Sequence, residues 1–63
     1  MGTARIVRKH REAMGLTQAQ LAARAGVSKP TVENIEMGKH QPEVETARRL
    51  AAVFQIVWTE LFE

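Results

Sequence analysis

The sequence predicts an all-α fold of five short helices, and three features of the chain predict it. Apolar residues recur at every third or fourth position, which is the spacing of the buried face of a helix. No stretch alternates apolar and polar residues with period two, and β-branched residues do not cluster, so we expect no strand. The chain divides into five segments, and the breaks between them fall at Gly15, Gly26, Gly38 with Pro42, and around Gln55.

We expect the first helix to run from about Ala4 to Met14. Thr3 is available as its N-cap, because a Thr hydroxyl can accept a hydrogen bond from an amide of the first turn. The inward stripe at helical spacing consists of Ala4, Val7, Arg11 and Met14. A charged residue therefore lies in an otherwise apolar face.

The second and third helices are expected to be very short. Thr17 is a good N-cap for the second, and Gly26 suits the left-handed conformation that commonly ends a helix. Ser28 is the N-cap of the third, and Pro30 fits its first turn, where a missing N–H costs nothing. Gly38 then ends this helix. The residues expected to face inward from the two helices are Leu21, Ala22, Ala25, Val32 and Ile35.

The last two segments follow Pro42. A fourth helix is indicated by apolar residues at i, i+3, i+6, i+7 and i+10, namely Val44, Ala47, Leu50, Ala51 and Phe54. A fifth helix of one or two turns is expected from Trp58 to Phe62.

The composition restricts the class of protein. We interpret residues 1–63 as one domain with a thin core, because so short a chain buries only about 60% of its unfolded surface. The sequence has no cysteine and two histidines, His10 and His40, so neither disulfides nor a metal site is expected to supplement that core. A partner subunit remains as a source of additional buried surface.

Hydropathy and charge restrict the class of protein less than the composition does. The opening MGTARIVRKH has no apolar stretch long enough for a signal peptide, and nowhere are there the roughly 20 apolar residues that span a bilayer, so we expect a cytoplasmic protein. The net charge of +2 is too small to indicate a nucleic acid. Basic residues concentrate before Ala13 and acidic ones from Glu43 onward, which fits either a polyanion-binding half or an ordinary solvated face.

The informative stretch is Gln18 to Met37, QAQLAARAGVSKPTVENIEM. Its residue types suit two short helices that cross at a tight turn. Ala22 is small where the helices approach, Gly26 allows a positive φ, and Val27 fills the space between them. This pattern predicts a helix-turn-helix, a unit whose second helix can lie in the major groove of DNA.

The same stretch resembles the phage-repressor and Cro-type family, often called XRE-like. The resemblance rests on L-T-Q-x-x-L-A at Leu16–Ala22, A-G-V-S at Ala25–Ser28 and I-E-x-G-K at Ile35–Lys39, and it continues through Pro42, Thr46–Phe54 and Glu60–Phe62. It implies a repressor-like domain that binds double-stranded DNA in a sequence-specific manner. The expected function is transcriptional regulation, as a repressor, at a palindromic operator.

Carried over position by position, the resemblance implies that Ser28, Lys29, Pro30, Glu33 and Asn34 read bases. The side-chain chemistry of most of these residues agrees with base reading. Lys29 can donate to guanine O6 or N7, Asn34 can bond adenine through two hydrogen bonds, and Glu33 can accept from cytosine N4. Pro30 can contact a thymine methyl group. The alternative is a solvated helix face, since exposed polar residues are ordinary.

The resemblance also implies contacts with the DNA backbone. Gln18 matches the family's phosphate clamp at the start of the second helix, beside Thr17 and the exposed amides. Lys39 and His40, in the loop after the third helix, are further candidates, although His40 suits an idle surface position equally well. Such contacts fix register and supply salt-sensitive affinity without reading sequence.

Arg11 and Glu36 occupy positions that the family pairs. The resemblance implies an ion pair that orients the Arg11 guanidinium toward the DNA backbone, and the alternative is two independent surface charges. If the pair is partly buried, removing Glu36 alone should destabilise the fold more than removing both groups, because a lone desolvated charge is the costly state.

Three positions depart from the family pattern. His10 stands where Leu is usual, Gln55 replaces the usual Gly after the fourth helix, and Val57 takes the place of a Ser or Asp N-cap. The fifth helix therefore starts poorly. The run from Ile56 to Trp58 is also more apolar than one short helix buries within its own domain.

We therefore expect a two-fold homodimer packed through Val57, Trp58 and Phe62, with Ile56 and Leu61 in the core of each protomer. The alternative is that one small core accommodates all five side chains. A dimer would hold two reading helices about 34 Å apart, which is what predicts a palindromic operator.

An enzyme is not expected, because the sequence has no cysteine, tyrosine or aspartate and neither histidine lies in a recognisable catalytic constellation. We also expect no cofactor, small-molecule ligand or membrane partner. The alternative function is a protein-interaction module on the same scaffold, such as an antitoxin. An antitoxin usually covers its toxin with an extra arm, and the sequence ends at Glu63 without one, which favours DNA binding.

Overall fold

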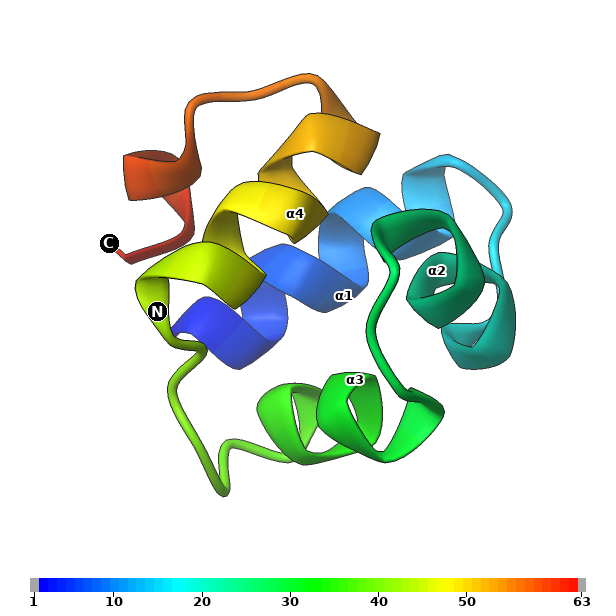
Figure 1. The fold of residues 1–63 in the computed structure, drawn as a ribbon, viewed down its shortest axis with the longest axis horizontal. Coiled ribbons are helices and arrows are strands. Elements are labelled where there is room, and N and C mark those ends of the chain that lie inside the picture. Colours follow the sequence, from blue (N-terminus) through cyan, green and yellow to red (C-terminus); the bar gives the residue numbers. More distant parts are fainter. Residues whose placement is uncertain (1, 63) are drawn as a thin grey trace.

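The computed structural model describes residues 2–62. The regular secondary structure of these residues is all helical, and turns and loops connect the helices. The elements are α1 (Thr3–Ala13), α2 (Gln18–Ala25), α3 (Lys29–Glu36), α4 (Val44–Phe54) and the 3-10 helix η1 (Trp58–Phe62). Figure 1 shows α1 and α4 crossing the middle of the molecule, with α2 and α3 on one side and η1 on the other. The all-α fold is confirmed. The fifth helix differs from expectation only in being 3-10 rather than α.

The beginnings of α2 and α3 form as their sequences predict. Thr17 Oγ1 accepts a hydrogen bond from the Gln20 amide at 3.0 Å, and the Gln20 side chain accepts one from the Thr17 amide at 2.8 Å. This reciprocal pair satisfies two backbone amides that have no acceptor within the helix. Ser28 Oγ likewise accepts from the Thr31 amide at 3.3 Å. Gly26 ends α2 at φ 73°, in the left-handed region that favours glycine.

Thr3 is not the N-cap of α1, contrary to expectation. Gly2 holds that position, and Thr3 is already the first helical residue. Its hydroxyl therefore projects from the side of the helix, where it donates to Gln41 Oε1 at 2.8 Å. The hydroxyl thus ties the start of α1 to the loop between α3 and α4.

One hydrophobic core lies between the helices. α3 packs on α1 and α2, while α4 packs on α1, α2 and η1. The largest fully buried side chains, Val7, Leu21, Val32, Leu50 and Leu61, come one from each element. Around them are the smaller or less enclosed Leu16, Ala22, Ala25, Ile35, Ala47, Ala51 and Phe54.

Two side chains assigned to inward stripes are exposed. Met14 and Val44 keep about half of their surface in water. Met14 follows α1 as its C-cap, and Val44 is the first residue of α4. Helical spacing identifies the buried face of a helix, but both residues lie where the helix ends and its neighbours no longer cover it.

Gln55 and His10 show how the fold accommodates residues that depart from the family pattern. Gln55 adopts the left-handed conformation (φ 59°) after α4, although it carries a side chain. His10 lies on α1 and stacks on Phe54, with ring centroids 5.1 Å apart and planes 23° apart. The imidazole therefore covers the edge of the core as an aliphatic side chain would.

Candidate nucleic-acid interface

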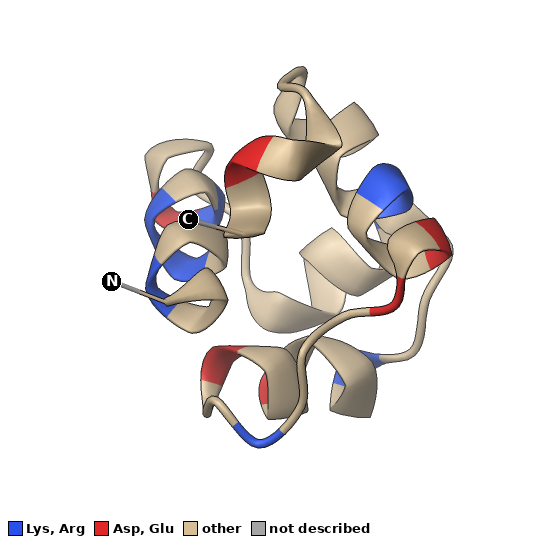
Figure 2. Ribbon diagram, turned by 90° about the vertical axis from the view of Figure 1, so that its left-hand side faces the viewer, with Lys and Arg blue, Asp and Glu red and all other residues tan. Residues whose placement is uncertain are grey.

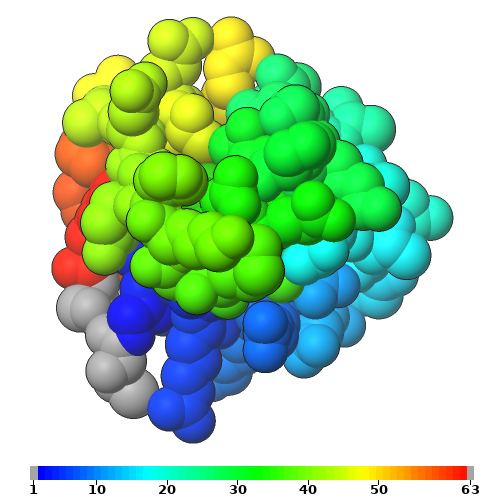
Figure 3. Space-filling view, turned by 90° about the horizontal axis from the view of Figure 1, so that it is seen from below, coloured from blue at the N-terminus to red at the C-terminus, as the bar shows by residue number. Residues whose placement is uncertain are grey.

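α3 presents one face to the core and the other to solvent. Figure 3 looks onto that exposed face, where α3 and the loop after it occupy the centre, beside the start of α1 and the start of α2. Val32 and Ile35 are buried beneath the helix. The five residues expected to read bases lie on its other side: Ser28, Lys29 and Pro30 are exposed, and Glu33 and Asn34 are partly exposed.

Two of these residues are paired with each other. Lys29 Nζ lies 3.8 Å from Glu33 Oε2, one helical turn away, and both side chains keep substantial contact with water. An exposed pair of this kind contributes little to stability. It does hold a positive and a negative group side by side on the face of α3.

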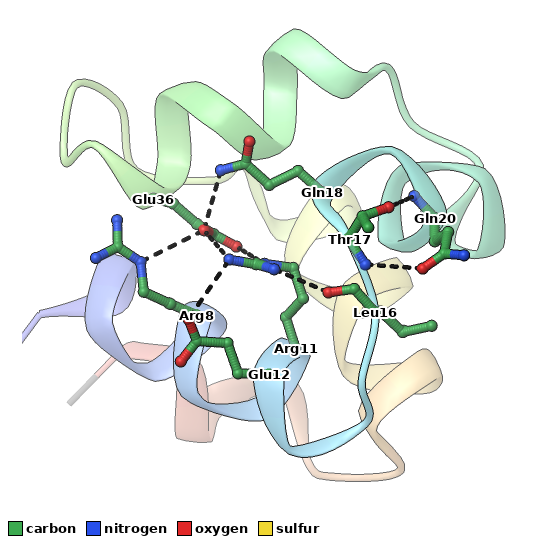
Figure 4. Close-up of polar contacts among 8 residues, drawn as sticks. All are labelled: Arg8, Arg11, Glu12, Leu16, Thr17, Gln18, Gln20 and Glu36. Atoms are coloured by element: carbon green, nitrogen blue, oxygen red, sulfur yellow. Dashed lines mark hydrogen bonds and ion pairs between the residues drawn. The ribbon is translucent and has the colours of Figure 1, made fainter.

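The expected ion pair between Arg11 and Glu36 is present and buried (Figure 4). Arg11 Nε donates to Glu36 Oε2 at 2.7 Å and Nη2 donates to Oε1 at 3.1 Å. The Glu36 side chain is 0% exposed and that of Arg11 is 14% exposed. Arg11 Nη1 also donates to the carbonyl of Leu16 at 2.8 Å. One guanidinium therefore links α1, the α1–α2 loop and the last residue of α3.

Glu36 has two further partners (Figure 4). Gln18 Nε2 donates to Glu36 Oε1 at 3.1 Å, and Arg8 Nε lies 3.6 Å from the same oxygen. The sequence analysis did not single out Arg8. Arg8 lies three residues before Arg11, a spacing that places both side chains on one face of a helix. The sequence therefore contained a signal that could have identified Arg8 as a second partner of Glu36. The carboxylate thus holds α3 against both α1 and the start of α2.

The Glu36 carboxylate stays charged despite its burial. Desolvation by itself would raise its pKa, but the hydrogen bonds from Arg11 and Gln18, with the charges of Arg11 and Arg8, outweigh it and lower the pKa below its ordinary 4.5. The hydrogen bond to Glu36 is in turn the main cause of a raised pKa at Arg11. Both members of the pair are therefore ionised at neutral pH.

The remaining backbone-contact candidates lie on the same side of the molecule as Glu36 or in the loop after α3. Thr17 is exposed, with its hydroxyl already engaged as the cap of α2. Lys39 and His40 are exposed in the α3–α4 loop, and His40 lines a hollow with Asn34. In Figure 2 several basic segments of the ribbon lie on α1, which packs against α3, and another lies on α4. Positive charge therefore flanks the exposed helix.

The side chains expected at a dimer interface divide into two groups. Val57 and Phe62 are 59% and 39% exposed. Trp58 is partly buried against the core, with the Arg48 guanidinium 5.4 Å from its ring and Phe62 edge-on at 6.0 Å. Ile56 packs on the core and Leu61 is fully buried, as the sequence analysis expected.

A family profile described as helix-turn-helix matches residues 7–61, nearly the whole described chain. The chain belongs to the helix-turn-helix family. This confirms the resemblance drawn from the motifs at Leu16–Ala22, Ala25–Ser28 and Ile35–Lys39. Within the family, α2 and α3 form the unit that gives it its name, and its members are DNA-binding transcriptional regulators.

Relatives in this family include an uncharacterized HTH-type transcriptional regulator of Methanothermobacter thermautotrophicus, 41% identical over 46 residues, or 73% of this chain and 67% of the relative. The HTH-type transcriptional regulator SlrR of Bacillus subtilis is 38% identical over 60 residues. That match covers 94% of this chain but 40% of SlrR, so the chain spans two fifths of that protein.

Solved structures agree with the helix-turn-helix assignment. The restriction-modification controller protein C.AhdI of Aeromonas hydrophila superposes with a TM-score of 0.87 at 30% identity, over 95% of this chain and 91% of that one. The P22 c2 repressor, solved in complex with a synthetic operator, gives a TM-score of 0.94 over 100% and 96% of the two chains. Its identity is 22%, so this likeness concerns the fold.

No helix among the described residues has the length and apolarity needed to cross a membrane.

Proposed function

We propose that this protein regulates transcription, as a repressor, by binding a specific sequence of duplex DNA through α3 in the major groove. The single observation that carries the proposal is the presentation of α3: an exposed helix face rich in hydrogen-bonding groups, held in place from behind by the buried Glu36 carboxylate. A helix so fixed can reach base edges without losing much conformational freedom on binding. We place this activity in one domain, residues 1–63, acting in the cytoplasm.

Base reading is assigned to the N-terminal part of α3. Lys29 is suited to guanine O6 and N7, and Asn34 to N6 and N7 of adenine. Ser28 and Pro30 begin the helix and would lie deepest in the groove, while Glu33 faces an exocyclic amino group.

Backbone contacts are assigned to the groups that flank α3. Thr17 and Gln18 start α2, where exposed amides favour a phosphate. Lys39 and His40 would reach the strand on the other side of the groove. Arg8 joins them, because Glu36 already has closer donors and more than half of the Arg8 side chain, 54%, is exposed. Arg11 supports this surface from behind, since little of it reaches water.

A homodimer would bring two such surfaces onto one face of the duplex. Val57 and Phe62 leave an apolar surface beside the partly buried Trp58, and a second copy of the chain is the partner we propose for it. Two reading helices about 34 Å apart would recognise half-sites one helical turn apart, that is, a palindromic operator.

The test is selection of bound duplexes from a random DNA pool, followed by gel-shift titration of the selected operator. Lys29→Ala and Asn34→Ala should weaken operator binding by about tenfold or more each, while altering affinity for random duplex far less. Arg49→Ala, on α4, is the control for loss of a surface cation. Equal losses on every DNA sequence, or no selected sequence at all, would contradict base reading by α3.

A further inference from the structure

The loop between α3 and α4 holds Lys39 and His40, and few backbone contacts fix its course. The Lys39 amide still donates to the Asn34 carbonyl of α3, at 3.0 Å. In the described part of the chain, no backbone hydrogen bond then involves residues 40–42. A segment with exposed side chains and so few backbone hydrogen bonds is weakly held by its own chain.

The loop also stands away from α3. A hollow of about 340 Å³ lies between them, with Asn34 and Ile35 on the side of the helix and His40, Gln41 and Pro42 on the side of the loop. Figure 1 shows the loop swinging out from the end of α3 before it turns back to α4 beside the start of α1. The flank of α3 therefore gives this part of the loop little support, and its position depends on other contacts.

A side-chain hydrogen bond from α1 supplies such a contact. Thr3 Oγ1 donates to Gln41 Oε1 at 2.8 Å. Thr3 is only 5% exposed, and it is the one buried polar or charged residue besides Glu36 in the described chain. Breaking the bond would leave a shielded hydroxyl without its acceptor, which costs free energy. The bond therefore holds the loop at a fixed place relative to α1.

Two different elements thus hold the residues on either side of His40. Lys39 is hydrogen-bonded to α3 through its amide, whereas Gln41 is hydrogen-bonded to α1 through its side chain. His40 is exposed between them. The direction of the His40 imidazole depends on where the Thr3–Gln41 bond holds the chain, while the direction of Lys39 depends on α3.

Building on the proposed function, we propose that Thr3 is a positioning residue for DNA binding, whose hydrogen bond to Gln41 holds the loop so that the His40 imidazole reaches a backbone phosphate. An imidazole carries at least one N–H that can donate to a phosphate oxygen, in its neutral and in its charged form. Thr3 itself lies in α1, outside the helix-turn-helix unit, and acts only through Gln41.

The experiment measures affinity for the operator that the wild-type protein selects, by gel-shift titration. The variants are Thr3→Val, His40→Ala and Lys39→Gln, singly and with Thr3→Val combined with each of the other two. Thr3→Val removes the hydroxyl with little change of shape, and Thr3→Ser keeps it. Thr46→Val is the matched control, because Thr46 lines the same hollow from α4, whereas the hydroxyl bonded to Gln41 is that of Thr3.

Thr3→Val and His40→Ala should each weaken operator binding by about fivefold, the value of one hydrogen bond. Their double variant should bind no more weakly than His40→Ala, because both substitutions remove the same contact. Thr3→Val and Lys39→Gln should instead weaken binding additively, since α3 fixes Lys39. Thr3→Ser and Thr46→Val should bind as wild type does.

Circular dichroism checks that each variant is folded at the assay temperature. If Thr3→Val is not, Gln41→Leu breaks the same hydrogen bond from the exposed side of the loop and takes its place in the comparison with His40→Ala. The expected losses and couplings are the same for this variant.

Wild-type affinity in the folded variant that lacks the bond, or a loss that adds to that of His40→Ala, would overturn the proposal while leaving DNA binding by α3 intact. If His40→Ala binds as tightly as wild type, the backbone contact of His40 is wrong and the proposal fails with it. A wild-type protein that selects no sequence contradicts the proposed function itself, and that outcome is distinct from the others.

Discussion

Arg11 and Glu36 form a two-point ion pair in which Arg11 Nε and Nη2 donate to the two carboxylate oxygens at 2.7 and 3.1 Å. The pair joins residues 25 positions apart and fixes the last residue of α3 to the middle of α1. Glu36 is the more deeply buried partner, so the two groups are not equivalent when one is removed.

Arg11→Met should lower the free energy of unfolding by about 3 kcal/mol, because it leaves a buried carboxylate without its main partner. Glu36→Leu should cost less, since Arg11 can turn toward water, and the double variant should be more stable than either single one. Urea unfolding followed by circular dichroism measures all three. Additive effects of the two single substitutions would contradict a coupled buried pair.

The lowered pKa of Glu36 predicts acid sensitivity. A carboxyl group whose pKa is lower in the folded protein than in the unfolded chain stabilises the fold above its ordinary pKa, here 4.5, and that contribution is lost as the pH falls through the folded value. The urea midpoint should therefore drop below about pH 4.5. Glu36→Gln should flatten this dependence. The same flattening in Glu45→Gln would assign the effect to surface charge instead.

Gln55→Gly should stabilise the protein by about 1 kcal/mol. Gln55 holds φ 59° after α4, a conformation that costs a residue with a Cβ roughly 1–2 kcal/mol, part of which is offset by the greater freedom of glycine in the unfolded chain. Thermal unfolding measures the gain. Gln55→Ala is the control and should bring no such gain, and equal melting temperatures for the Gly and Ala variants would refute the explanation.

Arg8→Gln should reduce the salt dependence of operator binding. A side chain that neutralises one phosphate contributes about 0.9 to the slope of log K against log salt concentration. Arg8→Gln should therefore lower the magnitude of the slope by about 0.9 per bound protomer. Arg49→Gln is closely matched, since the two arginines are 54% and 50% exposed and both are ion-paired. It should leave the slope unchanged, and identical slopes for the two variants would remove Arg8 from the interface.

Val57→Glu should abolish dimerisation without unfolding the protomer. Val57 is 59% exposed and is not among the residues that pack on the core, whereas Trp58 does pack there. A charge at Trp58 would disturb the protomer as well, so Val57 is the cleaner site. Sedimentation at micromolar concentration gives the mass. A wild-type monomer, or a Val57→Glu protein that remains dimeric, would contradict the proposed interface.

Structural features that depend on interactions between residues close together in the chain could be predicted from the sequence. The caps at Thr17 and Ser28 and the left-handed Gly26 depend on interactions within one turn of chain, and all three are confirmed. Thr3 was misassigned because its hydroxyl finds Gln41, 38 residues away, and local patterns do not encode such a partner. Val44 was misassigned because periodicity cannot show where a helix leaves the core.

The candidate site was only partly predictable for the same reason. The exposed face of α3 and the Arg11–Glu36 ion pair were predicted, because both follow from positions that match the family pattern. The motifs did not show that Gln18 and Arg8 also converge on Glu36, since that depends on how α1 and α2 approach the end of α3. Gln18 as a phosphate clamp stays a prediction.

The residues that fix α3 in place and the residues that face outward from it are two separate sets. Val32, Ile35 and Glu36 point inward, whereas Lys29, Glu33 and Asn34 take no part in the core. If the outer set reads bases as proposed, substitutions there would retarget the protein to a different operator while the scaffold keeps its stability. Under that assignment, operator preference would be free to diverge between relatives faster than the fold does.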